Sequence, residues 1–381
     1  MTKNRPRNLR AIGLTILLVV GAAVLIGRER RVSFLTPGLR LHAYTSIADG
    51  SVTVVDLVRL AVAARVQVGP GISGMREHPT RAEVWGASSV GGYVWVLDPR
   101  VNQVSARIPV GPLPYAIDFS GDGSKAYVAT AGNDSVATID CQTHAIVARA
   151  RTGREPVLAR VSPDGRTILV ANRGEATLGI HDAQSLALRA KVRVVSEPED
   201  ITVLPDSSVA FVLSRKEPRL SVVDLARGVL LTNLQLVGKA SEMLLKPDGG
   251  ELYVISPEAH GLQVINTWTH EVGDYVMLGS APRNGVLFAE VGALFVSDTA
   301  AGRVTPVDIT NRRVSRPIPA GSAPTVLRFD SSSADRRPSL LLVVDEASSE
   351  LVVIGLRGEK PDLLTMIPVG DRPQELAIKL F

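Results

Sequence analysis

The stretch PYAIDFSGDGSKAYVATAGNDSVATIDCQTHAIVARARTGREP, residues 114–156, sets out one structural unit between two prolines. Four short segments in it, PYAIDFS, KAYVATA, VATID and AIVARART, alternate apolar residues with small or polar ones, as half-buried strands do. The segments between them are rich in Gly, Asp and Asn, which favour tight hairpin turns. The stretch therefore predicts four antiparallel strands within about 42 residues.

The same unit recurs along the chain. The third strand of successive units ends in an acidic residue or its amide, at intervals of 42 residues, at Asp56, Asp98, Asp140, Asp182, Asp224, Asn266 and Asp308. An eighth unit ends at Gly355, 47 residues later, and its excess falls in the polar segment 331–338. Tandem four-stranded units of this length predict an all-β fold, a β-propeller, and the lack of a 3.6-residue period excludes helical repeats.

Three segments carry a family resemblance: AYVATAGNDSVATID, ILVANRGEATLGIHD and LYVISPEAHGLQVIN. They resemble the YVTN-repeat β-propeller family, and the resemblance covers nearly all of residues 41–381. It implies an exported or surface propeller, commonly of seven blades, whose relatives include lactonases and the haem-binding propeller of certain nitrite reductases. The sequence departs from the pattern at residues 71–85, where GISGMREHPTRAEVW replaces a strand, a turn and a strand.

The two ends of the repeat region predict how the ring closes. Residues 41–69 supply the second, third and fourth strands of a blade, and PQELAIKLF, residues 373–381, supplies a first strand with nothing after it. Joining them in one blade leaves no open sheet edge at the ends of the chain. This closure gives eight blades. The alternative is seven, with residues 71–85 acting as a connection.

The N-terminus predicts a membrane segment. Residues 11–27 carry no charge and are mostly apolar, and basic residues flank them on both sides. A helix of this length nearly crosses a hydrocarbon core. We expect residues 1–31 to form a cytoplasmic tail and an uncleaved transmembrane signal anchor, residues 32–40 a linker, and residues 41–381 the propeller, held in the periplasm or at the cell surface. The alternative is a cleaved signal peptide, which also exports the propeller.

Composition narrows the function. Residues 1–31 carry a net charge of +6 and the rest of the chain −2, so the propeller has no general field that would attract nucleic acid. The single cysteine, Cys141, excludes an intramolecular disulfide and a multi-cysteine metal site, and we expect it to be a surface or half-buried thiol. His144 and His270 occupy a repeat position that tolerates many residue types, which predicts an exposed turn. His181 is expected to be packed or hydrogen-bonded, and the recurring aspartates to cap turns.

The candidate ligand site is the mouth of the central channel, where the loops before the innermost strands converge. The second residue after the opening proline is Asp200, Glu242 and Asn284 in three consecutive units, so these side chains should lie on neighbouring blades at one depth. Such oxygen-bearing groups could hold a polar ligand or a hard cation. The candidate ligand-binding residues are Arg160, Glu199, Asp200, Glu242, Arg283, Asn284 and Glu375.

No catalytic motif accompanies this site. The sequence therefore predicts a non-enzymatic binding or scaffolding propeller without a cofactor, whose partner is a protein, an envelope component or a small ligand, and which reaches the membrane through its N-terminal helix. The alternative is a metal-assisted, lactonase-like hydrolase that uses carboxylates at the channel mouth.

Overall fold

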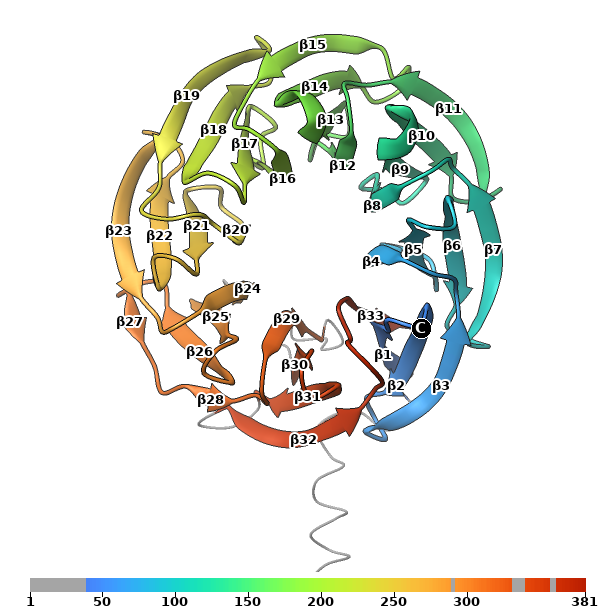
Figure 1. Ribbon diagram of the computed structural model, residues 1–381, viewed down its shortest axis with the longest axis vertical. Helices are drawn as coiled ribbons and strands as arrows, with labels where there is room; N and C mark the ends of the chain where they lie inside the picture. Colours follow the sequence, from blue (N-terminus) through green and yellow to red (C-terminus); the bar gives the residue numbers. More distant parts are fainter. Residues whose placement is uncertain (1–38, 289–291, 331–339, 357–360) are drawn as a thin grey trace, which may run out of the picture.

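The computed structural model describes residues 39–288, 292–330, 340–356 and 361–381. Eight antiparallel sheets stand around a central channel and form a closed ring, a β-propeller with eight blades (Figure 1). The anchor predicted for residues 1–31, most of the linker and the polar insertion at 331–338 lie outside the described residues. Within the described ranges, no helix is long and apolar enough to cross a membrane.

Each blade runs from an innermost strand at the channel to an outermost strand at the rim (Figure 1). From the inside outwards, blades one to four are β33 (Leu376–Leu380), β1 (Leu41–Ser46), β2 (Ser51–Asp56) and β3 (Ala61–Gln67); β4 (Ile72–Glu77), β5 (Val84–Ser88), β6 (Tyr93–Asp98) and β7 (Gln103–Pro109); β8 (Pro114–Phe119), β9 (Lys125–Thr130), β10 (Ser135–Asp140) and β11 (Ala145–Arg151); β12 (Pro156–Val161), β13 (Thr167–Asn172), β14 (Thr177–Asp182) and β15 (Leu188–Arg193).

Blades five to eight follow in the same order. They are β16 (Pro198–Val203), β17 (Val209–Ser214), β18 (Arg219–Asp224) and β19 (Val229–Gln235); β20 (Glu242–Leu245), β21 (Glu251–Ser256), β22 (Gly261–Asn266) and β23 (Glu271–Met277); β24 (Pro282–Phe288), β25 (Ala293–Asp298), β26 (Arg303–Asp308), β27 (Arg313–Val314) and β28 (Ile318–Pro319); β29 (Pro324–Phe329), β30 (Leu340–Asp345), β31 (Glu350–Gly355) and β32 (Asp362–Pro368).

The predicted closure is confirmed. The C-terminal strand β33 pairs antiparallel with β1, from Thr45 opposite Leu376 to Leu41 opposite Leu380, so blade one contains both ends of the repeat region. The alternative of seven blades is wrong, because residues 71–85 contribute β4 and part of β5 to a complete four-stranded blade. Blade seven differs from the prediction in its outermost strand, which is split into β27 and β28 around Pro317, a residue with no N–H to donate.

The core lies between blades, where apolar side chains of successive sheets interlock. Leu376 and Ile378 of β33 pack with Leu340 and Leu351 of blade eight in one such cluster. Trp85 and Trp95 in blade two are fully buried. Because each sheet buries both of its faces, the innermost strands are held firmly and can position side chains at the channel.

The recurring third-strand acids cap turns, as predicted. The Asp140 carboxylate accepts the N–H of Gln142 at 3.0 Å and of Thr143 at 2.8 Å, and Asp56, Asp182, Asn266 and Asp308 make equivalent bonds. The fourth residue after each acid has a positive φ, at Leu60, Asn102, His144, Leu186, Gly228, His270 and Arg312. This position is a turn, but it is not uniformly exposed, because His144 and His270 are half-buried and Leu186 is buried.

Candidate functional site

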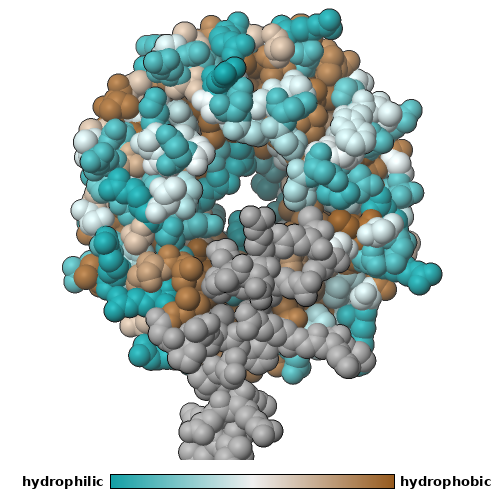
Figure 2. All heavy atoms as spheres, turned by 180° about the vertical axis from the view of Figure 1, so that it is seen from behind, coloured by the Kyte–Doolittle hydropathy of each residue, from teal (hydrophilic) through white to brown (hydrophobic). Residues whose placement is uncertain are grey.

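The central channel widens into a cavity of about 640 Å³ where the innermost strands begin, and we call this the mouth cavity. Its lining comes from seven of the eight blades, all except blade seven. The space-filling view, which looks at the ring from behind the view of Figure 1, shows an opening at its centre (Figure 2). The prolines that open five of the innermost strands lie next to the mouth, where their missing N–H costs no ladder bond, at Pro114, Pro156, Pro198, Pro282 and Pro324.

Five of the seven candidate residues line the mouth cavity together: Arg160, Glu199, Asp200, Glu242 and Glu375. Asn284 is a near neighbour, because its side chain bonds to the Glu242 carboxylate.

Arg283 does not join this group. It lies outside the cavity lining, with its side chain exposed, and its backbone carbonyl accepts the Ser241 hydroxyl. Glu199, at the equivalent position of blade five, lines the cavity, and Arg215 Nη1 holds its carboxylate at 3.1 Å. None of the described residues forms an ion pair with Arg283.

A chain of ion pairs links four successive blades along the channel wall. Arg76 on β4 pairs with Asp118 on β8, and Arg160 on β12 lies 3.7 Å from the Asp118 carboxylate and 3.6 Å from that of Asp200 on β16. Asp118 is 5% exposed, and its second oxygen accepts the N–H of Val161 at 3.0 Å. Alternating charges on adjacent innermost strands therefore satisfy one another across the blade boundaries.

Two members of this chain, Arg76 and Asp118, were absent from the sequence candidates. The signal was present, since Arg76, Asp118 and Arg160 are spaced by 42 residues and so share one repeat position. Asp200, Glu242 and Asn284 occupy a different repeat position, two residues closer to the opening proline.

This pairing bears on the hypothesis that the mouth holds a hard cation or a polar ligand. Asp200, one of the oxygen-bearing residues considered for it, lies 3.6 Å from the Arg160 guanidinium. Among the described residues, no group of three His, Cys, Asp or Glu side chains is arranged to hold a metal ion. The mouth cavity therefore combines charges of both signs rather than concentrating carboxylates.

Two carboxyl groups in the cavity have unusual proton affinities. Burial raises the pKa of Glu242 to about 7, although the N–H of Gly285 and the positive charge of Arg328 oppose the shift. Burial also raises the pKa of Glu375, against the opposing influence of Arg328 and hydrogen bonds from the backbone of Gly74 and Met75. Both groups can therefore gain a proton at a pH where ordinary glutamates are ionised.

The rim of the mouth carries two further arginines, both on turns between the second and third strands of their blades. Arg173 pairs with Glu155 at 2.6 Å and stacks over the Tyr115 ring, 5.5 Å from its centroid. Arg215 pairs with Glu199 and donates through Nε to the Ser241 carbonyl at 3.1 Å. The rim is thus fixed in position and charged on the side from which a solute would enter.

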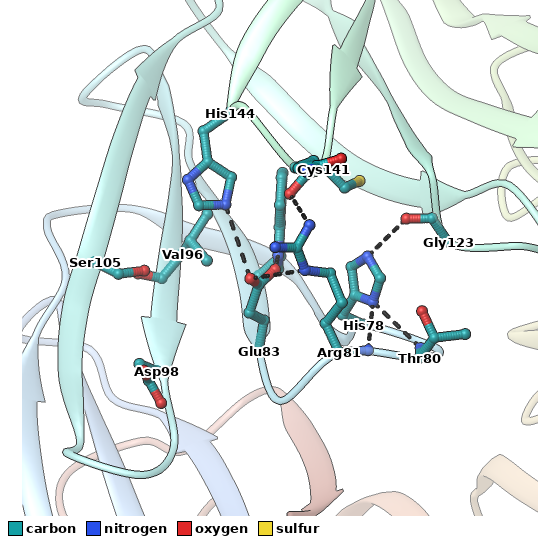
Figure 3. Close-up of polar contacts among 12 residues, drawn as sticks. His78, Thr80, Arg81, Glu83, Val96, Asp98, Ser105, Gly123, Cys141 and His144 are labelled. Carbon is teal, nitrogen blue, oxygen red and sulfur yellow. Dashed lines mark hydrogen bonds and ion pairs between the residues drawn. The ribbon is translucent and has the colours of Figure 1, made fainter.

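A second polar cluster, away from the mouth, explains the irregular residues 78–83 (Figure 3). The Glu83 carboxylate accepts the indole N–H of Trp85 at 2.9 Å and pairs with Arg81 at 3.2 Å. Arg81 also donates to the Cys141 carbonyl at 2.7 Å, and His144 Nε2 lies 3.9 Å from Glu83. These contacts fasten the long turn of blade two to blade three, which is a structural role.

The same cluster corrects the prediction for Cys141. Its side chain is fully buried rather than at the surface, and burial raises the pKa of its thiol to about 12.

The buried histidines are also structural. His78 Nε2 lies 2.8 Å from the Gly123 carbonyl, and its Nδ1 accepts the N–H of Arg81 at 3.0 Å. His181 is buried and bonds through Nδ1 to the Leu186 carbonyl at 3.0 Å, which confirms the packed role predicted for it. None of the residues that line the mouth cavity is a histidine.

No family model matches the sequence, and no curated protein matches it either. Solved structures do. Dihydro-heme d1 dehydrogenase NirN in complex with DHE superposes with a TM-score of 0.74 and 17% identity, over 90% of this chain and 76% of that one. Kuenenia stuttgartiensis hydrazine synthase gives a TM-score of 0.58 and 19% identity, over 76% of this chain and 96% of that one. Identities this low establish the fold alone, and no family model supports the narrower YVTN-repeat resemblance. By its sheets and its structural neighbours, the chain is an eight-bladed β-propeller.

Proposed function

We propose that this propeller is a binding module rather than an enzyme, and that its ligand enters the mouth cavity. The observation that carries the proposal is the lining itself: five arginines and four carboxylates from six blades converge on one cavity. Charged groups on the innermost strands cost desolvation and contribute little to packing between blades. A recognition site explains why they gather there.

The lining argues against catalysis by the usual polar groups. Among the described residues it holds no histidine, cysteine or lysine, and the hydroxyl of Ser73 is engaged as a donor to the Pro114 carbonyl at 3.0 Å. The Ser73 hydroxyl is therefore not paired with a base of the kind that activates a nucleophile. For the metal-assisted hydrolase considered from the sequence, the described residues offer no group of three His, Cys, Asp or Glu side chains arranged to hold a metal ion.

The structural neighbour NirN is named for a haem derivative, so we tested whether the mouth cavity fits a haem iron. The usual axial ligands are histidine, cysteine, methionine and tyrosine. Met75 and Met243 line the cavity, but they are 4% and 5% exposed and pack in clusters between blades. Tyr115 lies beneath the Arg173 guanidinium. These residues do not fit an axially ligated haem, and we do not extend that ligand to this chain.

We further propose that the module is exported and anchored by residues 11–27. The first described residues lie at the end of the ring away from the mouth, since Arg40 bonds to Phe381 whereas the Glu375 N–H reaches the Ser46 hydroxyl at the mouth end. An anchor on that side leaves the mouth facing away from the membrane, towards a protein, an envelope component or a small ligand. Protease added to spheroplasts should digest the propeller, because an exported propeller lies outside the cytoplasm. Full protection of the propeller would refute the export.

The binding proposal is tested by thermal shift of the full-length chain against a library of charged metabolites. Wild type should show at least one hit that Asp200→Asn and Glu242→Gln weaken. Arg59→Gln, on the opposite face and 82% exposed, is the matched control and should keep the hit. Hits that survive both mouth variants unchanged, or a complete absence of hits, would count against a ligand site at the mouth.

A further inference from the structure

Arg328 on β29 differs from the other arginines of the mouth cavity. Arg76, Arg160, Arg173 and Arg215 each form an ion pair with a carboxylate. In the part of the chain that the structure describes, Arg328 forms no ion pair, and its guanidinium donates only to the carbonyl of its own neighbour Leu327, at 2.9 Å. It is therefore the cation of the channel whose charge is available to a solute.

Its position makes it reachable. Arg328 lines the mouth cavity and also a second cavity of about 460 Å³ that continues beside Arg76 and Asp118. The side chain is exposed although its strand is innermost in blade eight. A molecule that enters through the mouth thus meets Arg328 where the two cavities adjoin.

The groups that face Arg328 leave its charge incompletely balanced. Glu242 on β20 and Glu375 beside β33 feel its positive charge, but neither forms an ion pair with it among the described residues. Burial raises the pKa of both carboxyl groups. The pKa of Glu242 rises to about 7, so this group is partly neutral near pH 7 and then offers an O–H donor. Asp200 on β16 and Asn284 on β24 complete the surroundings of Glu242 and also affect its proton affinity.

We propose, resting on the binding function proposed above, that the mouth cavity takes a small carboxylate-bearing molecule, which binds the Arg328 guanidinium while Glu242 takes up a proton. One guanidinium presents two parallel N–H groups that match a planar carboxylate. A phosphate dianion would bring a second negative charge towards Glu242 and Glu375, and the described lining holds no second arginine without an ion pair to offset that charge.

The coupling to protons follows from like charges. A carboxylate bound at Arg328 lies near Glu242 and Glu375 and raises their proton affinity further. The coupling between carboxylate binding and proton uptake is reciprocal. Protonation of these glutamates at lower pH must therefore tighten carboxylate binding. Affinity is expected to increase as the pH falls from 8 to 6.

The test is calorimetric titration of the full-length chain with citrate, succinate, acetate and inorganic phosphate, at matched ionic strength and at pH 6 and 8. At least one carboxylate should bind wild type, more tightly at pH 6. Arg328→Gln should weaken it at least tenfold, and Arg328→Lys by less. Glu242→Gln should weaken binding by less than Arg328→Gln does, and it should flatten the pH dependence. Arg59→Gln is the matched control and should match wild type. Thermal melts check that each variant is folded.

Several outcomes would overturn the inference: carboxylates that bind Arg328→Gln as well as wild type, phosphate binding without carboxylate binding, or unchanged pH dependence in Glu242→Gln. Failure of all four probes would also overturn it. If the metabolite library still yields a hit that Asp200→Asn weakens, this inference fails while the binding function stands. If the library yields no hit, the binding function fails as well.

Discussion

Removing residues 373–381 is expected to open the ring and to cost most of the stability of the protein. This segment contains β33, the innermost strand of blade one, which pairs with β1 over five residues. Leu376 is 2% exposed and Ile378 is 6% exposed, and both lie in the cluster that joins blades one and eight. The Lys379 ammonium also donates to the His78 carbonyl in blade two. The segment therefore holds one blade to both of its neighbours.

The size of the effect follows from this burial. Losing a buried Leu or Ile side chain costs about 2–5 kcal/mol, so the pair accounts for about 4–10 kcal/mol. A typical domain has about 5–15 kcal/mol in total. The deletion also exposes the unpaired edge of β1, which promotes aggregation. The truncated chain should consequently be aggregated or readily digested at temperatures where the full chain is intact.

Point variants in the same strand separate burial from chain length. Ile378→Ala should lower the free energy of unfolding by about 2–5 kcal/mol. Leu380→Ala, whose side chain is 40% exposed, is the matched control and should cost less than about 1 kcal/mol. Urea unfolding followed by tryptophan fluorescence and limited proteolysis measures both. The reasoning is refuted if the truncated chain melts within a few degrees of the full chain, or if the two point variants are equally destabilised.

Three further predictions concern single side chains. Glu242 has an ordinary pKa of 4.5 when unfolded and about 7 when folded, so its contribution to stability is full below pH 4.5 and is lost as the pH rises through 7. The melting temperature of Glu242→Gln should therefore depend less on pH across that window than that of wild type. Equal pH dependence of the two melting temperatures would contradict this. The buried thiol of Cys141, with its pKa near 12, should react with a disulfide reagent at pH 8 at least tenfold more slowly in the native protein than in urea, and equal rates would show that it is accessible. Asp345 is fully buried and accepts the N–H of Ala323 at 2.9 Å as well as that of Ser322, so Asp345→Ala should lower the free energy of unfolding by about 1–3 kcal/mol for each donor left unpaired; the exposed control Asp371→Ala should change it by less than about 0.5 kcal/mol, and similar losses in both would refute the capping role.

The last residue of the second strand in each blade shows which features the repeat pattern predicts and which it does not. Each blade ends this strand with a small polar or acidic residue that is at most 4% exposed: Ser46, Ser88, Thr130, Asn172, Ser214, Ser256, Asp298 and Asp345. Several of these bond to the loop that opens their own blade, as Asn172 does with the Gly153 N–H at 3.1 Å. The regular spacing of these polar residues is visible in the sequence. Their structural role is not, because the loop that each side chain holds lies about twenty residues earlier in the chain.

The sequence by itself determined the architecture. The interval of 42 residues and the two-residue alternation define the strands, and the complementary ends of the repeat region predicted both the closure and eight blades. These features are local or periodic, so the sequence of each repeat unit predicts them independently of the other units. Five of the residues that line the mouth cavity were predicted for a related reason, since equal repeat positions lie at equal depth in a ring.

Only the tertiary structure decided how the charges are used. Asp200 could have faced a cation, but Arg160 from the preceding blade takes its carboxylate, and Arg76 shares Asp118 with Arg160. Whether an arginine is paired depends on side-chain distances across a blade boundary. The repeat pattern of the sequence does not predict these distances. The same holds for the guanidinium of Arg328, which has no ion pair among the described residues, and for the proton affinity of Glu242. Desolvation and nearby charges act through space rather than along the chain.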